Sequence, residues 1–300
     1  MKNHYLHYLS EVMTHQWNDA ALTDYGEEKT YTFGDLAVEM ERLHVLFRQL
    51  GIKEGDKVAI AGRNCANWVV AYLAVASYRG VVVSILQDFK SEDIAKLLVH
   101  SDAKALFVGP YVWRELQQQS LEQLSAVISI ENFSVVRAKE GILVPTAEQI
   151  DAEMKTRYPH GMQPSDVHYD VNPDDLALIN YTSGSTGSPK GVMLNGRSLS
   201  NNVEAAIQIL PVEPGQRLVS MLPLAHMFGQ LADFLYPLCV GTHIYYLTKS
   251  PTPSLLLKAM AEVKPYMVAT VPLVIEKIHK QKLDPLLSKK ILKVCWYTPG

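Results

Sequence analysis

The chain has 300 residues, of which 48% are hydrophobic and 20% are charged, so it is long enough to bury a sizeable core. Its formal net charge of -3 provides no basic excess, and the composition therefore argues against nucleic-acid binding. Three widely separated cysteines, Cys65, Cys239 and Cys295, form neither a disulfide framework nor a metal-ligand spacing, which favours a reducing, cytoplasmic location.

No signal peptide is expected, because residues 1–20 lack a continuous apolar core and a small-residue cleavage site. The most apolar stretch, residues 69–86, is interrupted by Arg79 and Gly80 and is predicted to form a buried helix followed by a buried strand. A bilayer crossing needs roughly 20 largely uninterrupted apolar residues. We therefore expect no transmembrane segment, while peripheral contact with a membrane surface stays open.

The first half of the chain alternates amphipathic helices with short apolar strands. Thr32 is expected to cap a long helix that ends at Gly51. The apolar positions of this helix recur at steps of three and four, which places them on one face: Leu36, Met40, Leu43, Leu46 and Leu50. Strands are predicted at residues 57–62, 81–85 and 105–109, and helices at residues 67–77 and from Ser91 onward. This alternation indicates a mostly parallel sheet covered by helices on both faces.

Residues 158–175 interrupt this pattern with three prolines, two histidines and several acids, and they are predicted to form a surface linker. We therefore expect two α/β lobes, residues 1–165 and residues 166–300. In the second lobe, strands are predicted at residues 176–181, 218–222, 241–247, 266–270 and 292–297, and helices at residues 198–210 and 254–264. The predicted fold class is α/β, with mostly parallel sheets flanked by helices. Because the last residues read as the exit of a buried strand, we expect an incomplete N-terminal region.

The densest chemical signal is the run TSGSTGSPKG at residues 182–191, which directly follows an apolar strand. Small residues let the backbone fold tightly and turn several N–H groups into one concavity. The hydroxyl groups add neutral donors, and Lys190 adds a positive charge. Such a cradle suits the β- and γ-phosphates of ATP, because anions bind where backbone dipoles converge.

Two other interpretations of this run are weaker. A flexible Gly/Ser linker would not need an apolar strand before it, a β-like VMLN run after it and one lysine fixed between Pro189 and Gly191. A Walker loop requires G-x-x-x-x-G-K-[ST] opening into a helix, whereas Gly184 and Gly187 are too close together and Lys190 is followed by glycine. The phosphate cradle is therefore the preferred interpretation.

The run YTSGSTGSPKGV resembles the phosphate-loop signature of the adenylate-forming superfamily, which includes acyl- and aryl-CoA ligases, luciferases and peptide-synthetase adenylation domains. Residues 29–80 resemble the opening of the same family, although SILQDF at residues 84–89 departs from its usual proline and small polar residues. The resemblance implies that Thr182 helps to hold Mg²⁺. It also assigns phosphate binding to Thr182, Ser183, Gly184, Ser185, Thr186, Gly187 and Lys190.

Two further segments resemble parts of this family. LPLAHMFG at residues 222–229 resembles its second core motif, which implies that His226 lies at the acyl entrance and orients the carboxylate; a structural histidine is the alternative. Residues 270–278 resemble a run found in long-chain members, and this modestly favours a long-chain fatty acid as substrate. A helix that begins after Pro272 is equally compatible with these residues.

The resemblance implies an AMP-forming acyl-CoA ligase that uses ATP, Mg²⁺ and coenzyme A. A carboxylate would attack the α-phosphorus of ATP to give acyl-AMP and pyrophosphate, and the thiol of coenzyme A would then displace AMP. Lys190 and the loop would hold the pyrophosphate while His226 orients the acid. The family's adenine and ribose pockets and its C-terminal catalytic lysine would lie beyond Gly300, so little activity is expected from these 300 residues alone.

Two alternative functions stay open. One is an adenylation domain that loads an amino or aryl acid onto a carrier protein, and the other is a non-catalytic nucleotide-binding module. Other residues add little: His4 and His7 lie one turn apart without a further metal ligand, and Tyr245 and Tyr246 are expected to alternate between sheet faces. The sequence defines neither the chain length of the acid, nor the acceptor thiol, nor the oligomeric state.

Overall fold

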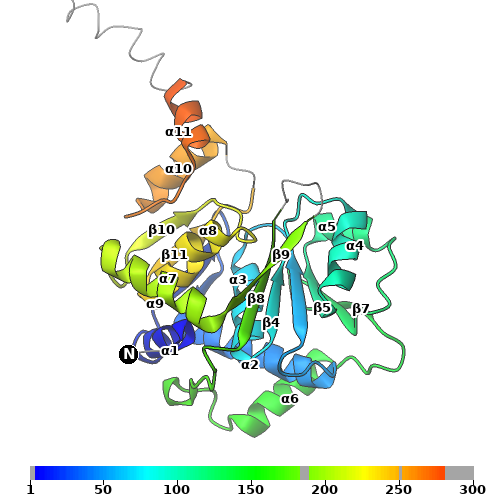
Figure 1. The fold of residues 1–300 in the computed structure, drawn as a ribbon. Coiled ribbons are helices and arrows are strands. Elements are labelled where there is room, and N and C mark those ends of the chain that lie inside the picture. The colour runs from blue at the N-terminus through cyan, green and yellow to red at the C-terminus, as the bar shows by residue number, and fades with distance from the viewer. Residues whose placement is uncertain (1–3, 183–188, 250–251, 281–300) are drawn as a thin grey trace, which may run out of the picture.

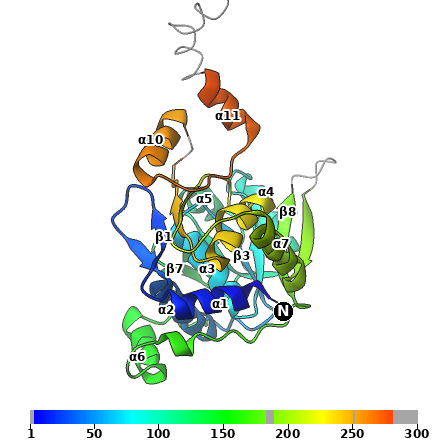
Figure 2. The same ribbon diagram turned by 90° about the vertical axis from the view of Figure 1, so that its left-hand side faces the viewer.

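The computed structural model describes residues 4–182, 189–249 and 252–280, and Figures 1 and 2 show its fold from two directions. Within these ranges the strands form two sheets. The larger sheet has the strand order β7 (Val135–Ala138), β6 (Ala126–Ser129), β5 (Ala103–Val108), β3 (Lys57–Ala61), β4 (Val81–Ser84), β8 (Leu176–Thr182) and β9 (Lys190–Asn195). The smaller sheet has the order β10 (Arg217–Ser220), β11 (His243–Tyr246), β1 (Ala20–Asp24) and β2 (Thr30–Thr32).

Both sheets are mostly parallel. The outer pairs β6–β7, β8–β9 and β1–β2 are antiparallel, and the other described pairs are parallel. Helices flank the sheets: α1 (Tyr5–His15), α2 (Phe33–Gln49), α3 (Ala66–Ser77), α4 (Ser91–His100), α5 (Pro110–Leu116), α6 (Ala147–Arg157), α7 (Gly196–Ile209), α8 (Met227–Gln230), α9 (Tyr236–Cys239), α10 (Pro253–Val263) and α11 (Pro272–Ile278). Short helical turns occur at η1 (Pro164–Asp166) and η2 (Leu231–Leu235). The predicted α/β class is therefore confirmed.

Helices cover both faces of the larger sheet because the strand residues alternate between the two faces. On β3, Val58 and Ile60 join the core formed with α2 and α3, whereas Ala59 and Ala61 pack with residues of α4 and α5. Successive side chains on a strand point to opposite faces, so a strand that is apolar throughout requires cover on both sides. The parallel sheet with helices on both faces, predicted from the βα alternation, is confirmed.

Helix α2 begins and ends where the sequence predicts. The hydroxyl of Thr32 accepts the N–H of Asp35, and the Asp35 carboxylate accepts the N–H of Thr32, which completes a capping box. The chain leaves the helix at Gly51, whose φ of +71° is a left-handed conformation that side chains rarely adopt. Local chemistry therefore sets both boundaries of this helix.

Helix α3 accounts for the most apolar stretch of the sequence. Apart from Asn67, every residue from Ala66 to Ala76 is buried. The helix packs against β3 and β4 of the larger sheet and against β1 of the smaller one. The ring centroids of Trp68 and Phe234 lie 5.9 Å apart in an edge-to-face arrangement. None of the helices in the described ranges is both long enough and apolar enough to cross a bilayer.

Each sheet takes strands from both sides of residue 165, so that position does not separate the sheets, and the division into residues 1–165 and residues 166–300 stays a prediction. The strand predicted at residues 266–270 is wrong, because the structure has only an isolated bridge there, between Leu218 and Met267. The strand predicted at residues 292–297 lies outside the described residues.

The segment predicted as a surface linker is anchored by two buried side chains. Val167 and Tyr169 are each 8% exposed, and the Tyr169 hydroxyl donates to the sulfur atoms of Met13 and Met40. Most of the remaining residues in this segment are exposed or half-buried. The burial of Val167 and Tyr169 was not predicted, because the two residues stand in a polar segment that has neither the helical nor the strand period of apolar residues.

Candidate functional site at the carboxyl ends of the strands

Strands from both sheets end at a common crevice of about 320 Å³. Four of the segments that line it lie just after a strand: residues 62–64, 86–88, 221–225 and 247–249. Val271 and Val274, at the start of α11, complete the lining. In open α/β folds, ligands bind outside the carboxyl ends of strands, where the connections diverge. The position of the crevice therefore makes it a candidate site before any motif is considered.

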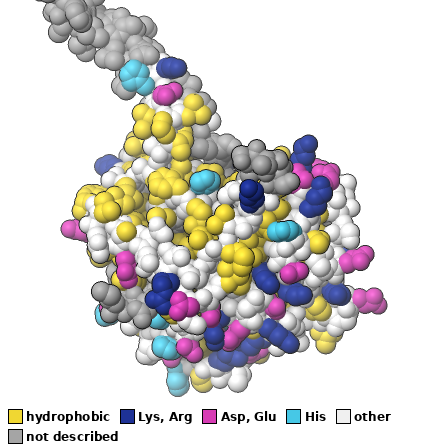
Figure 3. Space-filling view, viewed as in Figure 1, with side chains coloured by type: hydrophobic (Ala, Val, Ile, Leu, Met, Phe, Trp, Pro, Cys, Tyr) yellow, Lys and Arg dark blue, Asp and Glu magenta, His cyan; other side chains and the backbone are white. Residues whose placement is uncertain are grey.

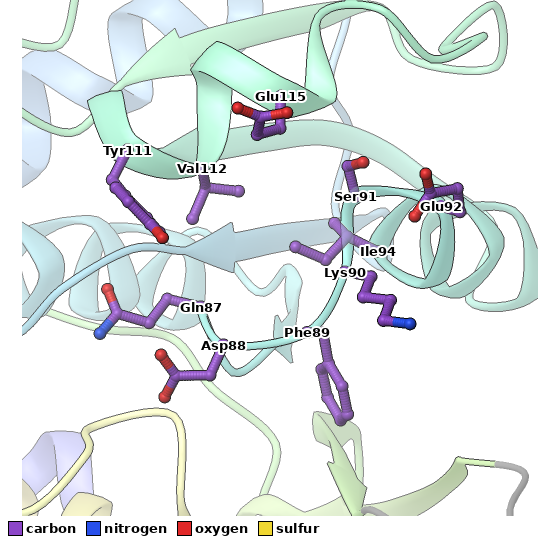
Figure 4. A pocket seen from close by; sticks show the side chains of 10 residues that line it. All are labelled: Gln87, Asp88, Phe89, Lys90, Ser91, Glu92, Ile94, Tyr111, Val112 and Glu115. Atoms are coloured by element: carbon purple, nitrogen blue, oxygen red, sulfur yellow. The ribbon is translucent and has the colours of Figure 1, made fainter.

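A neighbouring hollow of about 410 Å³ shares Gln87 and Asp88 with this crevice. Figure 4 shows Tyr111 and Val112 of α5 on the opposite side of the hollow from the turn that contains Gln87 and Asp88. Three carboxylates and one ammonium group line it: Asp88, Glu92, Glu115 and Lys90. This acidic lining disfavours an anionic ligand. The SILQDF segment at residues 84–89 lies in the connection from β4 to α4, and it contributes Gln87, Asp88 and Phe89 to the lining of this hollow.

The predicted phosphate loop connects the antiparallel strands β8 and β9. Thr182 and Lys190 are paired across the ladder, and both are exposed at its end. Beneath them Gly191 faces the ring of Tyr181, where an added Cβ would lie 3.2 Å from the ring, so glycine allows the two strands to approach closely. Five residues with predicted phosphate-binding roles lie outside the described residues: Ser183, Gly184, Ser185, Thr186 and Gly187. Their roles stay predictions.

His226 is exposed at the start of α8, where it acts as the N-cap. The ring atom Nδ1 accepts the backbone N–H of Phe228 at 3.3 Å, and the backbone N–H of His226 donates to the carbonyl of Pro223 at 2.9 Å. Because Nδ1 is an acceptor, the neutral ring carries its proton on Nε2. An exposed Nε2–H can donate a hydrogen bond to a carboxylate, as the predicted role of His226 requires.

Glycine at position 229 allows α8 to lie directly on the turn before it. A Cβ at Gly229 would lie 2.3 Å from the carbonyl oxygen of Pro223, which is far inside a van der Waals contact.

Exposed apolar side chains lie near this turn and elsewhere on the surface. Phe228, next to Gly229, is 52% exposed. On the face shown in Figure 3, the upper left part is mostly hydrophobic, while the lower part carries most of the charged side chains.

A hydrogen bond joins the turn that carries His226 to the strand before the predicted phosphate loop. We name residues 222–226 the His226 turn. The amide of Asn180, on β8 two residues before Thr182, donates to the carbonyl of Ala225 at 2.8 Å. The segment that carries His226 is therefore bonded directly to the strand that leads into the predicted phosphate loop, although Asn180 and Ala225 are 45 positions apart in the sequence.

A buried carboxylate holds the beginning of the same turn. Asp233, in the π-helical turn η2, is 3% exposed and accepts from the Ser220 hydroxyl and from the N–H groups of Met221 and Leu222 at 2.9–3.0 Å. Burial raises the pKa of this carboxyl to about 7, although the three hydrogen bonds act in the opposite direction. Turn η2 therefore fixes the exit of β10.

Sequence analysis missed three polar residues of this region, namely Asn64, Asn180 and Asp233. Asn180 had a detectable signal, since it is an amide inside the apolar run LALINYT and is only 2% exposed. A buried polar side chain normally has a hydrogen-bond partner to satisfy it. Asp233 likewise interrupts an apolar segment, whereas Asn64 lies in a polar loop without a distinguishing pattern.

The comparisons with known proteins agree with this architecture. The family model described as AMP-binding enzyme matches residues 9–296. The chain is 29% identical over 245 residues to the long-chain-fatty-acid–CoA ligase ACSBG2 of Rattus norvegicus, across 77% of this chain and 35% of that protein. It is 26% identical over 272 residues to 4-coumarate–CoA ligase 1 of Arabidopsis thaliana, across 88% and 47% respectively. The chain spans less than half the length of the curated relatives it matches.

Solved structures share the fold. The inhibitor-bound N-terminal domain of FACL13 from Mycobacterium tuberculosis superposes with a TM-score of 0.75 at 18% identity, covering 93% of this chain and 66% of that one. A red-emitting luciferase from Phrixothrix hirtus gives a TM-score of 0.78 at 18% identity, covering 94% and 53%. At these identities the likeness establishes the fold alone.

Proposed function

The chain belongs to the family of AMP-binding enzymes, and from that premise we propose that the protein carrying it is an AMP-forming acid–thiol ligase. It would activate a carboxylic acid with ATP and transfer the acyl group to coenzyme A. The observation that carries this proposal is the hydrogen bond from Asn180 to Ala225, which joins the turn that carries His226 to the strand that precedes the predicted phosphate loop. A ligase that joins an acid to a nucleotide needs both groups at one crevice.

The predicted site residues have distinct roles in the proposed first step. Lys190 would bind the β- and γ-phosphates electrostatically, with the Thr182 hydroxyl beside it. The Nε2–H of His226 would donate to one carboxylate oxygen of the acid and leave the other to attack the α-phosphorus. The bond from that phosphorus to the bridging oxygen then breaks, and pyrophosphate leaves.

In the second step the thiolate of coenzyme A would attack the acyl carbonyl carbon, and AMP would depart with its phosphate oxygen. No residue of the chain needs to become covalently attached in either step, because the acyl phosphate anhydride already provides the leaving group. The catalytic roles of Lys190 and His226 are thus binding and orientation.

The described residues are compatible with Mg²⁺ only as part of a shared coordination shell. Within them, no group of three or more His, Cys, Asp or Glu side chains could hold a metal ion. Magnesium in phosphoryl-transfer sites is bound mainly by substrate phosphates and water, with one or two protein ligands. The exposed Thr182 hydroxyl fits that pattern, and the ion would neutralise charge on the pyrophosphate.

The acid is proposed to be a long-chain fatty acid. The segment at residues 270–278 supports this choice, as do the apolar side chains of Met221, Leu222 and Leu247 in the crevice lining. The acids in the relatives' names differ, since one names a long-chain fatty acid and another 4-coumarate. The cytoplasm remains the predicted compartment.

ATP–pyrophosphate exchange by the full-length protein, with fatty, aryl and amino acids, tests the function. Exchange with fatty acids and thioester formation with coenzyme A are expected. Exchange restricted to amino or aryl acids, with transfer only to a carrier protein, would replace the proposal by an adenylation domain. ATP binding without exchange for any acid would favour the non-catalytic module.

A further inference from the structure

Asn64 forms the bridge across the crevice between the two sheets. It lies in the loop after β3 of the larger sheet, and its Nδ2 donates to the carbonyl of Leu222 at 2.6 Å. Its Oδ1 accepts the N–H of Leu224 at 3.0 Å. One planar amide thus holds two backbone groups of the His226 turn, which follows β10 of the smaller sheet.

The turn is fixed more firmly than a surface loop requires. Besides the Asn64 bridge, Asn180 bonds to Ala225 from β8, and Asp233 accepts the N–H of Leu222 from η2. At the end of α8, the fully buried Gln230 donates to the Ser84 hydroxyl on β4 at 2.9 Å. Backbone groups at a surface can bond to water instead, so side-chain bonds from several elements indicate that the position of this turn matters.

We propose that Asn64 is a positioning residue of the ligase, which sets the place of His226 relative to the β8–β9 hairpin by clamping the turn from the side of β3. This inference rests on the proposed function. Asn180 holds the turn on the phosphate-loop side, and Asn64 holds it on the side of β3. Both clamps act on backbone groups within four residues of His226, so losing either one displaces the ring.

Asn67 provides a matched control for Asn64. It lies three residues further along, and its Nδ2 donates to the carbonyls of Ile130 and Glu131 at 2.8 and 2.9 Å. Replacing either asparagine by alanine removes an amide that holds two backbone groups, and Asn67→Ala also removes the acceptor of the Tyr31 hydroxyl, which donates to Oδ1 at 2.7 Å. Only Asn64→Ala removes bonds to the His226 turn. A difference in exchange kinetics between the two variants therefore reflects the position of this turn and not a general loss of stability.

Exchange kinetics on the full-length protein test the proposal. For Asn64→Ala we expect a loss of roughly tenfold to a hundredfold in kcat/KM for the acid, with the KM for ATP within about twofold of wild type. Asn67→Ala should leave both constants within about twofold, although both variants lower the melting temperature. Equal kinetic losses in the two variants, or no loss in Asn64→Ala, would overturn the positioning role.

A second measurement asks whether Asn64 acts through His226. In a His226→Ala background, adding Asn64→Ala should cost less than about twofold, because the ring it positions is already absent. A full additional loss would contradict the proposal. If wild type exchanges no acid, the proposed function fails, and the ring signals of His226 in NMR spectra decide the positioning role. Asn64→Ala should shift them and Asn67→Ala should not; unshifted signals in Asn64→Ala would overturn it.

Discussion

The β8–β9 hairpin and the His226 turn are joined by the hydrogen bond from Asn180 to Ala225 but are built in opposite ways. The described end of the hairpin is joined by a ladder and presents Thr182 and Lys190 to solvent. The His226 turn has its backbone held by Asn64, Asn180 and Asp233, each from a different element. A site for two reactants needs groups that contact the ligand and groups that only position them, and these two regions separate those tasks.

The largest effect is expected for a ligand-facing group. Lys190→Ala should lower kcat/KM in ATP–pyrophosphate exchange by about a hundredfold to a thousandfold, because the positive charge that would stabilise the negative charge of the leaving pyrophosphate is lost. Its melting temperature should stay near that of wild type, since an exposed side chain contributes little to stability. A large fall in melting temperature would show that the hairpin depends on Lys190 for its structure.

A glycine-to-alanine substitution should cost more stability in the His226 turn region than in the β8–β9 hairpin. Gly229→Ala should destabilise the protein by about 2–3 kcal/mol, because the new Cβ would lie 2.3 Å from the backbone oxygen of Pro223, which the anchored turn keeps in place. Gly191→Ala should cost under about 1 kcal/mol, since the side chains of Ile179 and Tyr181, which the new Cβ would meet at 3.1–3.2 Å, need to shift by only a few tenths of an ångström. Urea unfolding measures both, and equal costs would remove the distinction.

The smallest effect concerns pH and the buried anchor Asp233. Its folded pKa of about 7 lies above the ordinary value of 3.8, so the folded state binds more protons than the unfolded state between these values. The stability contributed by this proton is present below about pH 4 and is lost as pH rises toward 7. Relative to Asp233→Asn, wild type should therefore lose on the order of 2 kcal/mol between pH 4 and 6. Urea unfolding at several pH values measures the difference, and parallel profiles would contradict it.

Sequence reasoning predicted elements whose boundaries depend on neighbouring residues. The cap at Thr32, the turn at Gly51 and the strand–loop–strand arrangement around Lys190 are all local, and the structure has them where expected. It failed at residues 266–270, where an apolar run forms only one bridge, and it did not anticipate the burial of Tyr169. Both outcomes depend on which distant residues lie alongside, and periodicity does not report that.

By itself, the sequence determined the α/β class, the helix caps and the chemical character of the run at residues 182–191, because these follow from backbone conformation, spacing and side-chain type. Only the tertiary structure decided that strands from both halves of the chain share each sheet and that Asn180 bonds to the His226 turn. It also decided that Asn64 spans the crevice. The reason is physical: a hydrogen bond between segments 45 or 158 positions apart depends on how the sheets pack, and no local pattern records that packing.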